Sequence, residues 1–98
     1  MKTFEEIKKI IEEHRQELEF KFKVKEIGIF GSYVRGEQDE TSDIDILVDY
    51  SDGHISLFDV LELKYYFEEL LGLKADIVTR EALKPVIGRH ILDEVVFV

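Results

Sequence analysis

The sequence predicts an α/β fold, in which a small mixed sheet has helices packed against it. The apolar run over residues 24–30 is typical of a buried strand. Apolar residues recur at three- and four-residue spacing over residues 4–18 and 57–71, which predicts two amphipathic helices. Shorter strand-like runs at 44–50 and 74–78 flank the second helix. This order of strand, helix and strand favours parallel strands joined by a right-handed crossover.

The first helix begins with a capping signal. Thr3 precedes Phe4, and Glu6 stands three residues after Thr3, which is the spacing of a capping box. The apolar stripe then runs to Leu18, so we expect one continuous helix. His14 lies on this stripe, where it is expected to pack or to face a partner, and we leave it out of the site.

The turn that follows the first strand has the composition of an anion-binding site. Its sequence is Gly31-Ser32-Tyr33-Val34-Arg35-Gly36. A glycine that leads into a helix lets backbone N–H groups converge on an anion, and the helix dipole adds positive potential there. Because the turn follows a buried strand, we expect it at the carboxyl end of that strand, where open α/β sheets bind ligands. A plain strand-to-helix loop is the alternative, since glycine and serine are ordinary turn formers.

Two aspartates stand at the start of the next strand. Asp43 and Asp45 flank Ile44, and side chains two residues apart on a strand point to the same face. Their Cα atoms are expected to lie ~7 Å apart, close enough for the carboxylates to share a metal ion. A divalent cation would offset the desolvation and repulsion of this pair. Ile46 and Val48 are expected to enter the core with Ile44. The alternative to a metal site at Asp43 and Asp45 is a solvated strand end without a ligand.

The second helix also has clear ends. Ser56 is placed as its N-cap, and Gly72 is a typical stop. Phe58, Tyr65 and Tyr66 lie outside the tidiest apolar stripe. We expect wide core burial for these three aromatic side chains, with a contact surface for a partner as the alternative.

The C-terminal part of the chain predicts two further elements. Residues 81–92 favour a short helix with Pro85 near its first turn. Residues 95–98 are apolar and favour a terminal strand. Such an edge strand would need cover from the domain itself or from another subunit.

The two central motifs together resemble the signature of a known family. Gly31-Ser32-x-x-Arg35-Gly36 followed by Ser42-Asp43-x-Asp45 resembles the polymerase β-like nucleotidyltransferases. The short chain resembles in particular the minimal nucleotidyltransferases, or MNT proteins, which act as antitoxins beside HEPN-domain toxins. The resemblance covers nearly the whole chain and implies a polymerase β palm-like core. It also implies transfer of a nucleoside monophosphate from a magnesium-bound triphosphate to a hydroxyl and, for the antitoxin members, adenylylation of a toxin tyrosine.

The chemistry that the resemblance implies needs a third carboxylate, for which we choose Asp76. It lies in a short strand-like run with apolar neighbours on the opposite face, and a parallel crossover would place it beside Asp45. Asp43, Asp45 and Asp76 would then hold two Mg²⁺ ions, with Asp76 helping the acceptor hydroxyl to lose its proton. Asp49 is the main rival, but it lies ~13 Å from Asp45 along the strand, too far for a shared metal. An ordinary surface aspartate is the alternative for Asp76.

The resemblance also implies that the turn binds the nucleotide. The expected phosphate-binding residues are Gly31, Ser32, Arg35 and Gly36. Arg35 has two interpretations that the sequence does not separate. It contacts a phosphate, or it holds Glu37, Glu40 or another carboxylate and so stiffens the loop.

Composition limits the classes of protein to consider. The chain has 98 residues, of which 45% are hydrophobic, which is enough for a single domain over residues 1–98. Cysteine, bilayer-length apolar runs and a basic-then-apolar leader are absent from the sequence, so we expect a cytoplasmic protein without a membrane segment. A net charge of −9 argues against general nucleic-acid binding. Triphosphate binding is compatible with this charge, because distant surface charges are screened over about 8 Å.

These observations lead to an expected function. We expect an enzyme that uses Mg²⁺ and ATP to adenylylate a hydroxyl of a partner protein, with a HEPN-type toxin encoded nearby as the partner that the resemblance implies. The alternative is a non-catalytic module that neutralises a partner by forming a complex. Transfer to a small molecule is a third interpretation, which would usually need an added domain or a dimer to form the acceptor site.

Overall fold

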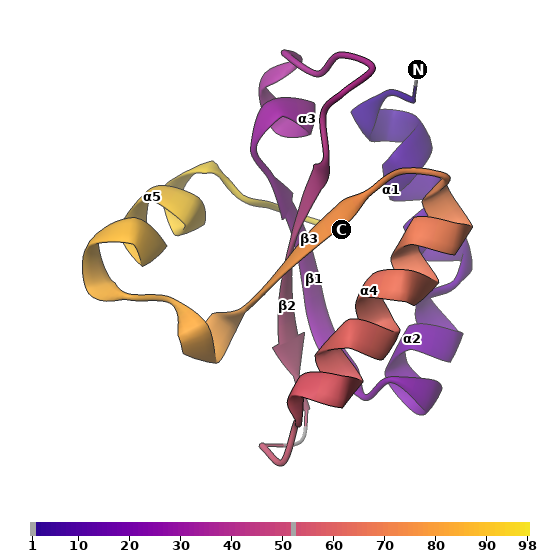
Figure 1. Cartoon of the computed structure of the whole chain (residues 1–98), viewed down its shortest axis with the longest axis vertical. Coiled ribbons are helices and arrows are strands. Elements are labelled where there is room, and N and C mark those ends of the chain that lie inside the picture. The colour runs from indigo at the N-terminus through magenta and orange to yellow at the C-terminus, as the bar shows by residue number, and fades with distance from the viewer. Residues whose placement is uncertain (1, 52) are drawn as a thin grey trace.

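The computed structural model describes residues 2–51 and 53–98, and in these residues four strands form one mixed sheet (Figure 1). The strands are β1 (Val24–Phe30), β2 (Ile44–Tyr50), β3 (Ala75–Thr79) and β4 (Val96–Phe97). Their order across the sheet is β3-β2-β1-β4. β2 is antiparallel to β1 and parallel to β3, and β4 is antiparallel to β1. The predicted mixed sheet and the parallel pair β2–β3 are therefore confirmed.

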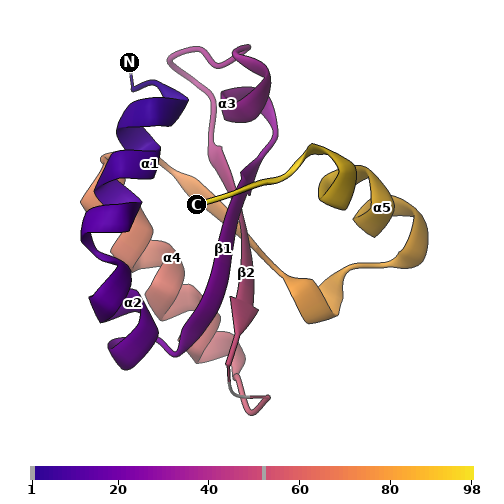
Figure 2. The ribbon, with the colours of Figure 1, turned by 180° about the vertical axis from the view of Figure 1, so that it is seen from behind.

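Helices lie on both sides of this sheet. They are α1 (Phe4–Glu13), α2 (Arg15–Lys21), α3 (Ser32–Arg35), α4 (Leu57–Leu71) and α5 (Pro85–Glu94), with a 3₁₀ turn, η1 (Arg80–Ala82), before α5. Figures 1 and 2 show α1, α2 and α4 together on one side of the sheet and α5 on the other. Within the described part of the chain, no helix is both long and apolar enough to cross a membrane.

The core lies between the sheet and the three helices α1, α2 and α4. The expected burial of Ile44, Ile46 and Val48 on β2 is confirmed. Burial of each such aliphatic side chain contributes about 1.5–3 kcal/mol to folding. The helices complete this core with Ile7, Ile11, Leu18, Leu63, Phe67 and Leu71. β2 is therefore held in place by its core face, which fixes the direction of its other face.

The N-terminal helix is interrupted, so the expectation of one continuous helix is wrong. The predicted capping box of Thr3 and Glu6 is present at the start of α1. At His14 the backbone leaves the helical range, with φ −109° and ψ 12°, and α2 begins at the next residue. The backbone N–H of His14 donates to Ile11 O at 3.1 Å, and its ring Nδ1 is 2.8 Å from Ile10 O. These local bonds tighten and end the helix, because they satisfy carbonyls of its last turn.

Helix α4 has the predicted ends, but its aromatic side chains differ from expectation. Ser56 caps its N-terminus, and Gly72 ends it in the left-handed conformation at φ 68°. Phe58 and Tyr65 are 82% and 60% exposed, so wide core burial is wrong for these two. Both lie on the helix face opposite the buried residues, because the α-helical period of 3.6 residues turns them away from the sheet. Of the three aromatic side chains, only Tyr66 agrees with the expected burial, since it is half-buried.

The C-terminal segment is shifted relative to the prediction. The expected helix over 81–92 is divided into η1 and α5, and Pro85 is the first residue of α5. Proline suits this position, because the first helical residue has no intrahelical partner for its N–H. The terminal strand is confirmed but is reduced to Val96–Phe97, which pairs with β1 at Gly28 and Ile29.

Candidate active site

The turn after β1 has a backbone that only glycine adopts readily. Gly31 has φ 80° and ψ −154°. A Cβ atom at this position would lie 2.1 Å from Oδ2 of Asp45, so the carboxylate packs directly against the turn. The register places Phe30 of β1 opposite Asp45 of β2, which explains why the turn and this side chain meet. Gly31 is therefore required both by its conformation and by the approach of Asp45.

Helix α3 begins immediately after this glycine. The carbonyl of Gly31 accepts from the N–H groups of Val34 and Arg35 at 3.1 and 3.2 Å. The N–H groups of the first helical residues, which include Ser32, lack partners within such a helix and face its N-terminal side. Gly36 ends α3 in the left-handed conformation at φ 71°, which is a structural reason for the second glycine of the motif.

The sheet brings two of the predicted carboxylates together. Asp45 and Asp76 lie opposite each other in the parallel register of β2 and β3, which confirms that they are neighbours. Burial raises the pKa of Asp45, and the negative charges of Asp76 and Asp43 raise it further. The positive charge of Arg35 lowers the pKa of Asp45 and so opposes these effects. Asp43 and Asp76 are exposed and Asp45 is half-buried, so all three carboxylates are accessible to solvent.

The loop before β2 sets the position of Asp43. The carboxylate of Asp39 accepts from the backbone N–H and the hydroxyl of Thr41 at 2.8 and 2.7 Å, and from the hydroxyl of Ser42 at 3.3 Å. The Ser42 hydroxyl in turn accepts from the Asp39 N–H at 2.9 Å. These bonds lower the pKa of Asp39 and fold the loop back on itself. The serine of the motif therefore orders the loop that leads to the carboxylates.

The rival carboxylate lies elsewhere on the sheet. Asp49 is opposite Glu26 of β1, near the other end of β2, and the β2–β3 pairing ends one residue before it, at Val48 and Thr79. Asp49 therefore does not meet Asp76 across the sheet, which favours the selected set of three carboxylates.

The carboxylate site suits a hard divalent cation. Within residues 2–51 and 53–98, no three His, Cys, Asp or Glu side chains are arranged tightly enough to hold a metal by themselves. Mg²⁺ is usually held by one or two carboxylates together with water and substrate phosphates, so a closed protein cage is not needed. Desolvation and the negative charges of Asp76 and Asp43 both disfavour the ionised form of Asp45, so a positive charge would be favourable there. The residues present therefore fit Mg²⁺ brought in with a nucleotide.

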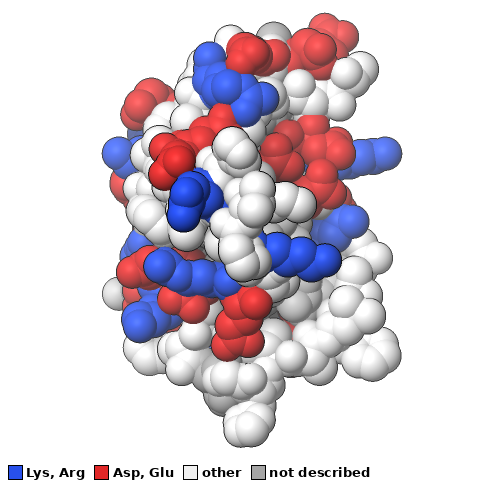
Figure 3. All heavy atoms as spheres, turned by 90° about the vertical axis from the view of Figure 1, so that its left-hand side faces the viewer, with Lys and Arg blue, Asp and Glu red and all other residues white. Residues whose placement is uncertain are grey.

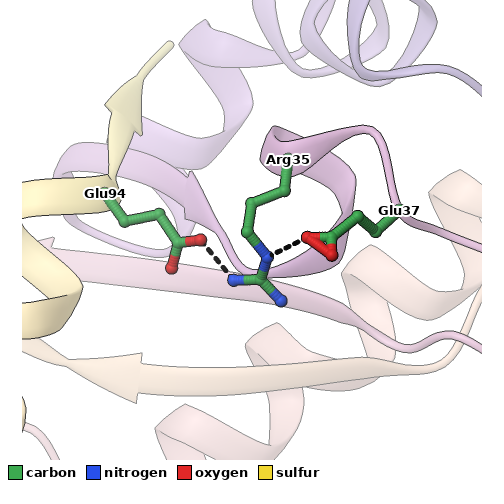
Figure 4. A network of polar contacts seen from close by, with 3 residues as sticks. All are labelled: Arg35, Glu37 and Glu94. Carbon is green, nitrogen blue, oxygen red and sulfur yellow. Dashed lines mark hydrogen bonds and ion pairs between the residues drawn. The ribbon is translucent and has the colours of Figure 1, made fainter.

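Arg35 contacts two carboxylates, as one of its two sequence interpretations requires. Its Nε donates to Glu37 Oε1 at 2.7 Å, and its Nη1 donates to Glu94 Oε1 (Figure 4). These hydrogen bonds, to Glu94 first and Glu37 second, raise the pKa of Arg35. Glu40, which the sequence also offered, has no such contact among the described residues. A contact of Arg35 with phosphate stays a prediction.

Two residues near the site were missed by the sequence analysis. Glu94 reaches Arg35 from the end of α5, and its charge also raises the pKa of Asp45. Tyr33 is only 2% exposed, and among the described residues its hydroxyl has no hydrogen-bond partner. Burial and the charges of Asp39 and Asp43 raise the pKa of Tyr33. The position of Tyr33 within the turn motif could have indicated that it lies near the site. No local sequence pattern indicated this for Glu94.

Comparison with known proteins identifies the family to which the chain belongs. A family model described as "Nucleotidyltransferase domain" matches residues 11–98. The chain therefore belongs to the nucleotidyltransferase domain family and is a nucleotidyltransferase.

Particular relatives narrow this class. The chain is 51% identical to protein adenylyltransferase MntA of Thermococcus cleftensis, over all of this chain and 98% of that protein. A crystal structure of a toxin–antitoxin with AMP-PNP contains a chain of 27% identity, with a TM-score of 0.74, over 93% of this chain and 70% of that chain. The same fold occurs in a structure of the tri-AMPylated Shewanella oneidensis HEPN toxin in complex with MNT antitoxin. The matched chain there is 24% identical, with a TM-score of 0.65, over 93% of this chain and 66% of that chain.

The comparisons also confirm two expectations from the sequence. The chain has the nucleotidyltransferase fold that the motif resemblance implies, and the proteins similar to it include a protein adenylyltransferase named MntA and a chain of a toxin–antitoxin structure. The assignment of individual residues to metal and nucleotide stays a prediction, which rests on the geometry described above.

Proposed function

We propose that this nucleotidyltransferase is an MNT antitoxin that transfers AMP from ATP to a tyrosine hydroxyl of a partner HEPN toxin in a Mg²⁺-dependent reaction. The observation that carries the proposal is the pairing of Asp45 with Asp76, beside the Gly31 turn. The identity with a protein adenylyltransferase over the whole chain supports it.

The carboxylates have distinct roles in the proposed reaction. Asp43, Asp45 and Asp76 would hold the Mg²⁺ ions, which would neutralise the triphosphate and polarise the reacting phosphate. Asp76 is exposed on β3, the edge strand of the sheet, and would take the proton of the acceptor hydroxyl. The acceptor oxygen forms a bond to the α-phosphorus, the bond from that phosphorus to the diphosphate breaks, and the diphosphate leaves.

The turn provides the groups that bind the triphosphate. The first N–H groups of α3 and the hydroxyl of Ser32 are donors, and Gly31 lets the backbone come close to the phosphates. Gly36 keeps α3 to a single turn, so that Arg35 stands next to the carboxylates. Each of these groups is uncharged or positive, which offsets the acidic site at the point where the phosphates would lie.

The acceptor comes from a second protein in this proposal. The three carboxylates and the turn lie on an open edge of a small domain, where a protruding side chain of a partner can reach them. ATP and a HEPN toxin encoded by a neighbouring gene would both be met in the cytoplasm, where we place the reaction. Acidic and basic side chains are interspersed on the side of the molecule that carries α5 (Figure 3), which suits a protein partner better than a nucleic-acid backbone.

Labelled ATP tests the proposal directly. The chain is incubated with α-labelled ATP, Mg²⁺ and the HEPN protein encoded beside it, and the label is followed by gel and mass spectrometry. We expect label on a tyrosine of the partner, reduced at least ~100-fold by Asp45→Asn. Asp49→Asn removes the same charge from the same strand outside the site and is expected to retain labelling within about twofold. A stable complex without label would favour the non-catalytic module and contradict the proposal.

A further inference from the structure

Arg35 and Glu94 connect the candidate nucleotide turn to the C-terminal helix. They are the last residues of α3 and α5, and 59 positions separate them in the sequence. Figures 1 and 2 show α5 standing away from the sheet. Among residues 2–51 and 53–98, the pair is the one polar side-chain contact between α5 and another helix. The contact therefore ties α5 to the turn.

The two carboxylates hold the guanidinium of Arg35 without using all of its donors. A guanidinium carries five N–H donors in one plane, and carboxylates bonded at Nε and Nη1 fix the orientation of that plane. Glu37 and Glu94 occupy these two positions. The remaining donors are sufficient for a bidentate contact with a phosphate.

Glu94 is the better shielded of the two anchors. Its side chain is 26% exposed, compared with 60% for Glu37, so solvent weakens its contact with Arg35 less. The charges of both Arg35 and Glu94 act on Asp45, which places the pair beside the central carboxylate. Glu94 therefore lies where it can orient Arg35 toward a nucleotide that binds at the carboxylates.

We propose that Glu94 is a positioning residue for nucleotide binding, which holds the guanidinium of Arg35 beside the carboxylates with its remaining donors available to the triphosphate. This inference rests on the proposed function, because it assumes that the nucleotide binds at this turn. It makes the end of α5 a part of the nucleotide site, although α5 contributes no residue to the sequence motif.

Nucleotide binding without turnover provides the first test. A non-hydrolysable ATP analogue with Mg²⁺ is titrated by calorimetry into the wild-type chain and into Glu94→Gln, which keeps the shape of the side chain and removes its charge. We expect the Kd of Glu94→Gln to rise about three- to tenfold. Asp93→Asn is the matched control, because Asp93 is exposed at the same helix end and, among the described residues, makes no hydrogen bond or ion pair with Arg35. The Kd of Asp93→Asn is expected to stay within about twofold of the wild-type value.

A double-mutant cycle separates positioning from a general structural effect. In the Arg35→Ala background, Glu94→Gln is expected to change the Kd by less than twofold, because the residue through which it acts is gone. In the labelling reaction, Glu94→Gln is expected to raise the KM for ATP with little change in kcat. Glu94→Asp keeps the charge with a shorter reach, and its Kd is expected between those of the wild type and Glu94→Gln, which provides a second variant if Glu94→Gln unfolds.

Three results would overturn the inference. An unchanged or lower Kd for Glu94→Gln would mean that Glu94 does not hold Arg35 in a binding-competent position. A full effect of Glu94→Gln in the Arg35→Ala background would mean that it acts by another route. If the wild type itself fails to bind the analogue, the proposed function fails and this inference fails with it. If the wild type binds the analogue and all variants bind it with equal affinity, only the inference is contradicted.

Discussion

Asp45 is the residue on which the candidate site is centred. Its carboxylate packs against Gly31, faces Asp76 across the sheet and lies within the electrostatic reach of Asp43, Arg35 and Glu94. Without a cation, an ionised Asp45 is partly desolvated and is repelled by Asp76, Asp43 and Glu94, which the attraction of Arg35 offsets only in part. A strand residue placed in this way costs stability and is best explained by binding.

The electrostatics of Asp45 predict how stability depends on pH in the metal-free chain. Its folded-state pKa is raised above the ordinary value of 3.8, so its contribution to stability is full below that value and is lost as the pH rises through the raised pKa. Asp45→Asn is therefore expected to raise the Tm at pH 7 by a few degrees and to have little effect near pH 3.

Thermal melts of both proteins at the two pH values, with EDTA present, check this prediction. Asp49→Asn is the matched control and is expected to show a smaller change. Addition of Mg²⁺ with nucleotide should then stabilise the wild type more than Asp45→Asn. A lower Tm of Asp45→Asn at pH 7 in EDTA would contradict the electrostatic account.

At the scale of elements, the register between β2 and β3 decides which carboxylates meet. A slip of one residue along β3 would turn Asp76 to the other face of the sheet. Helix α4 makes the crossover between these strands, and its length and ends set where β3 begins. The caps of α4 therefore contribute indirectly to the geometry of the site.

The N-cap of α4 leads to a stability prediction. The Ser56 hydroxyl accepts from the N–H of Asp59 at 3.3 Å, and the Asp59 carboxylate accepts from the Ser56 N–H at 2.9 Å. Ser56→Ala is expected to lower the free energy of unfolding by about 1 kcal/mol, because it removes the acceptor of an otherwise unpaired helical N–H. Denaturant unfolding measures this change. Ser56→Thr keeps the acceptor and should cost less than half as much, and an equal loss in both variants would exclude the cap as the cause.

At the scale of the whole molecule, the net charge of −9 affects association more than folding. The acidic site is open, and the chain as a whole attracts a basic partner over about one Debye length. In the proposed function, the partner toxin brings its acceptor tyrosine to the acidic site.

Salt dependence tests the contribution of this charge to complex formation. The Kd of the complex with the cognate toxin is expected to rise about tenfold or more between 50 and 500 mM NaCl, because salt screens the attraction between oppositely charged surfaces. Calorimetry or surface plasmon resonance at several salt concentrations measures it. A Kd that does not respond to salt would mean that apolar contacts, and not charge, hold the partner.

The sequence by itself determined the principal elements and the three carboxylates proposed for the site. Alternating apolar residues predicted β2, the Ser56 and Gly72 caps predicted α4, and the glycines and aspartates of the motif indicated the chemistry. These features are local, because periodicity, capping and turn formation depend on residues a few positions apart.

Only the tertiary structure decided the contacts between distant segments. It placed Asp45 against Gly31 and showed that Arg35 is held by Glu94. The tertiary structure also leaves Phe58 exposed, whereas the sequence pattern predicted that the aromatic side chains of this helix would be widely buried. These outcomes depend on strand register and on which helix face meets the sheet, which are set by packing of residues far apart in the chain and carry no local signal.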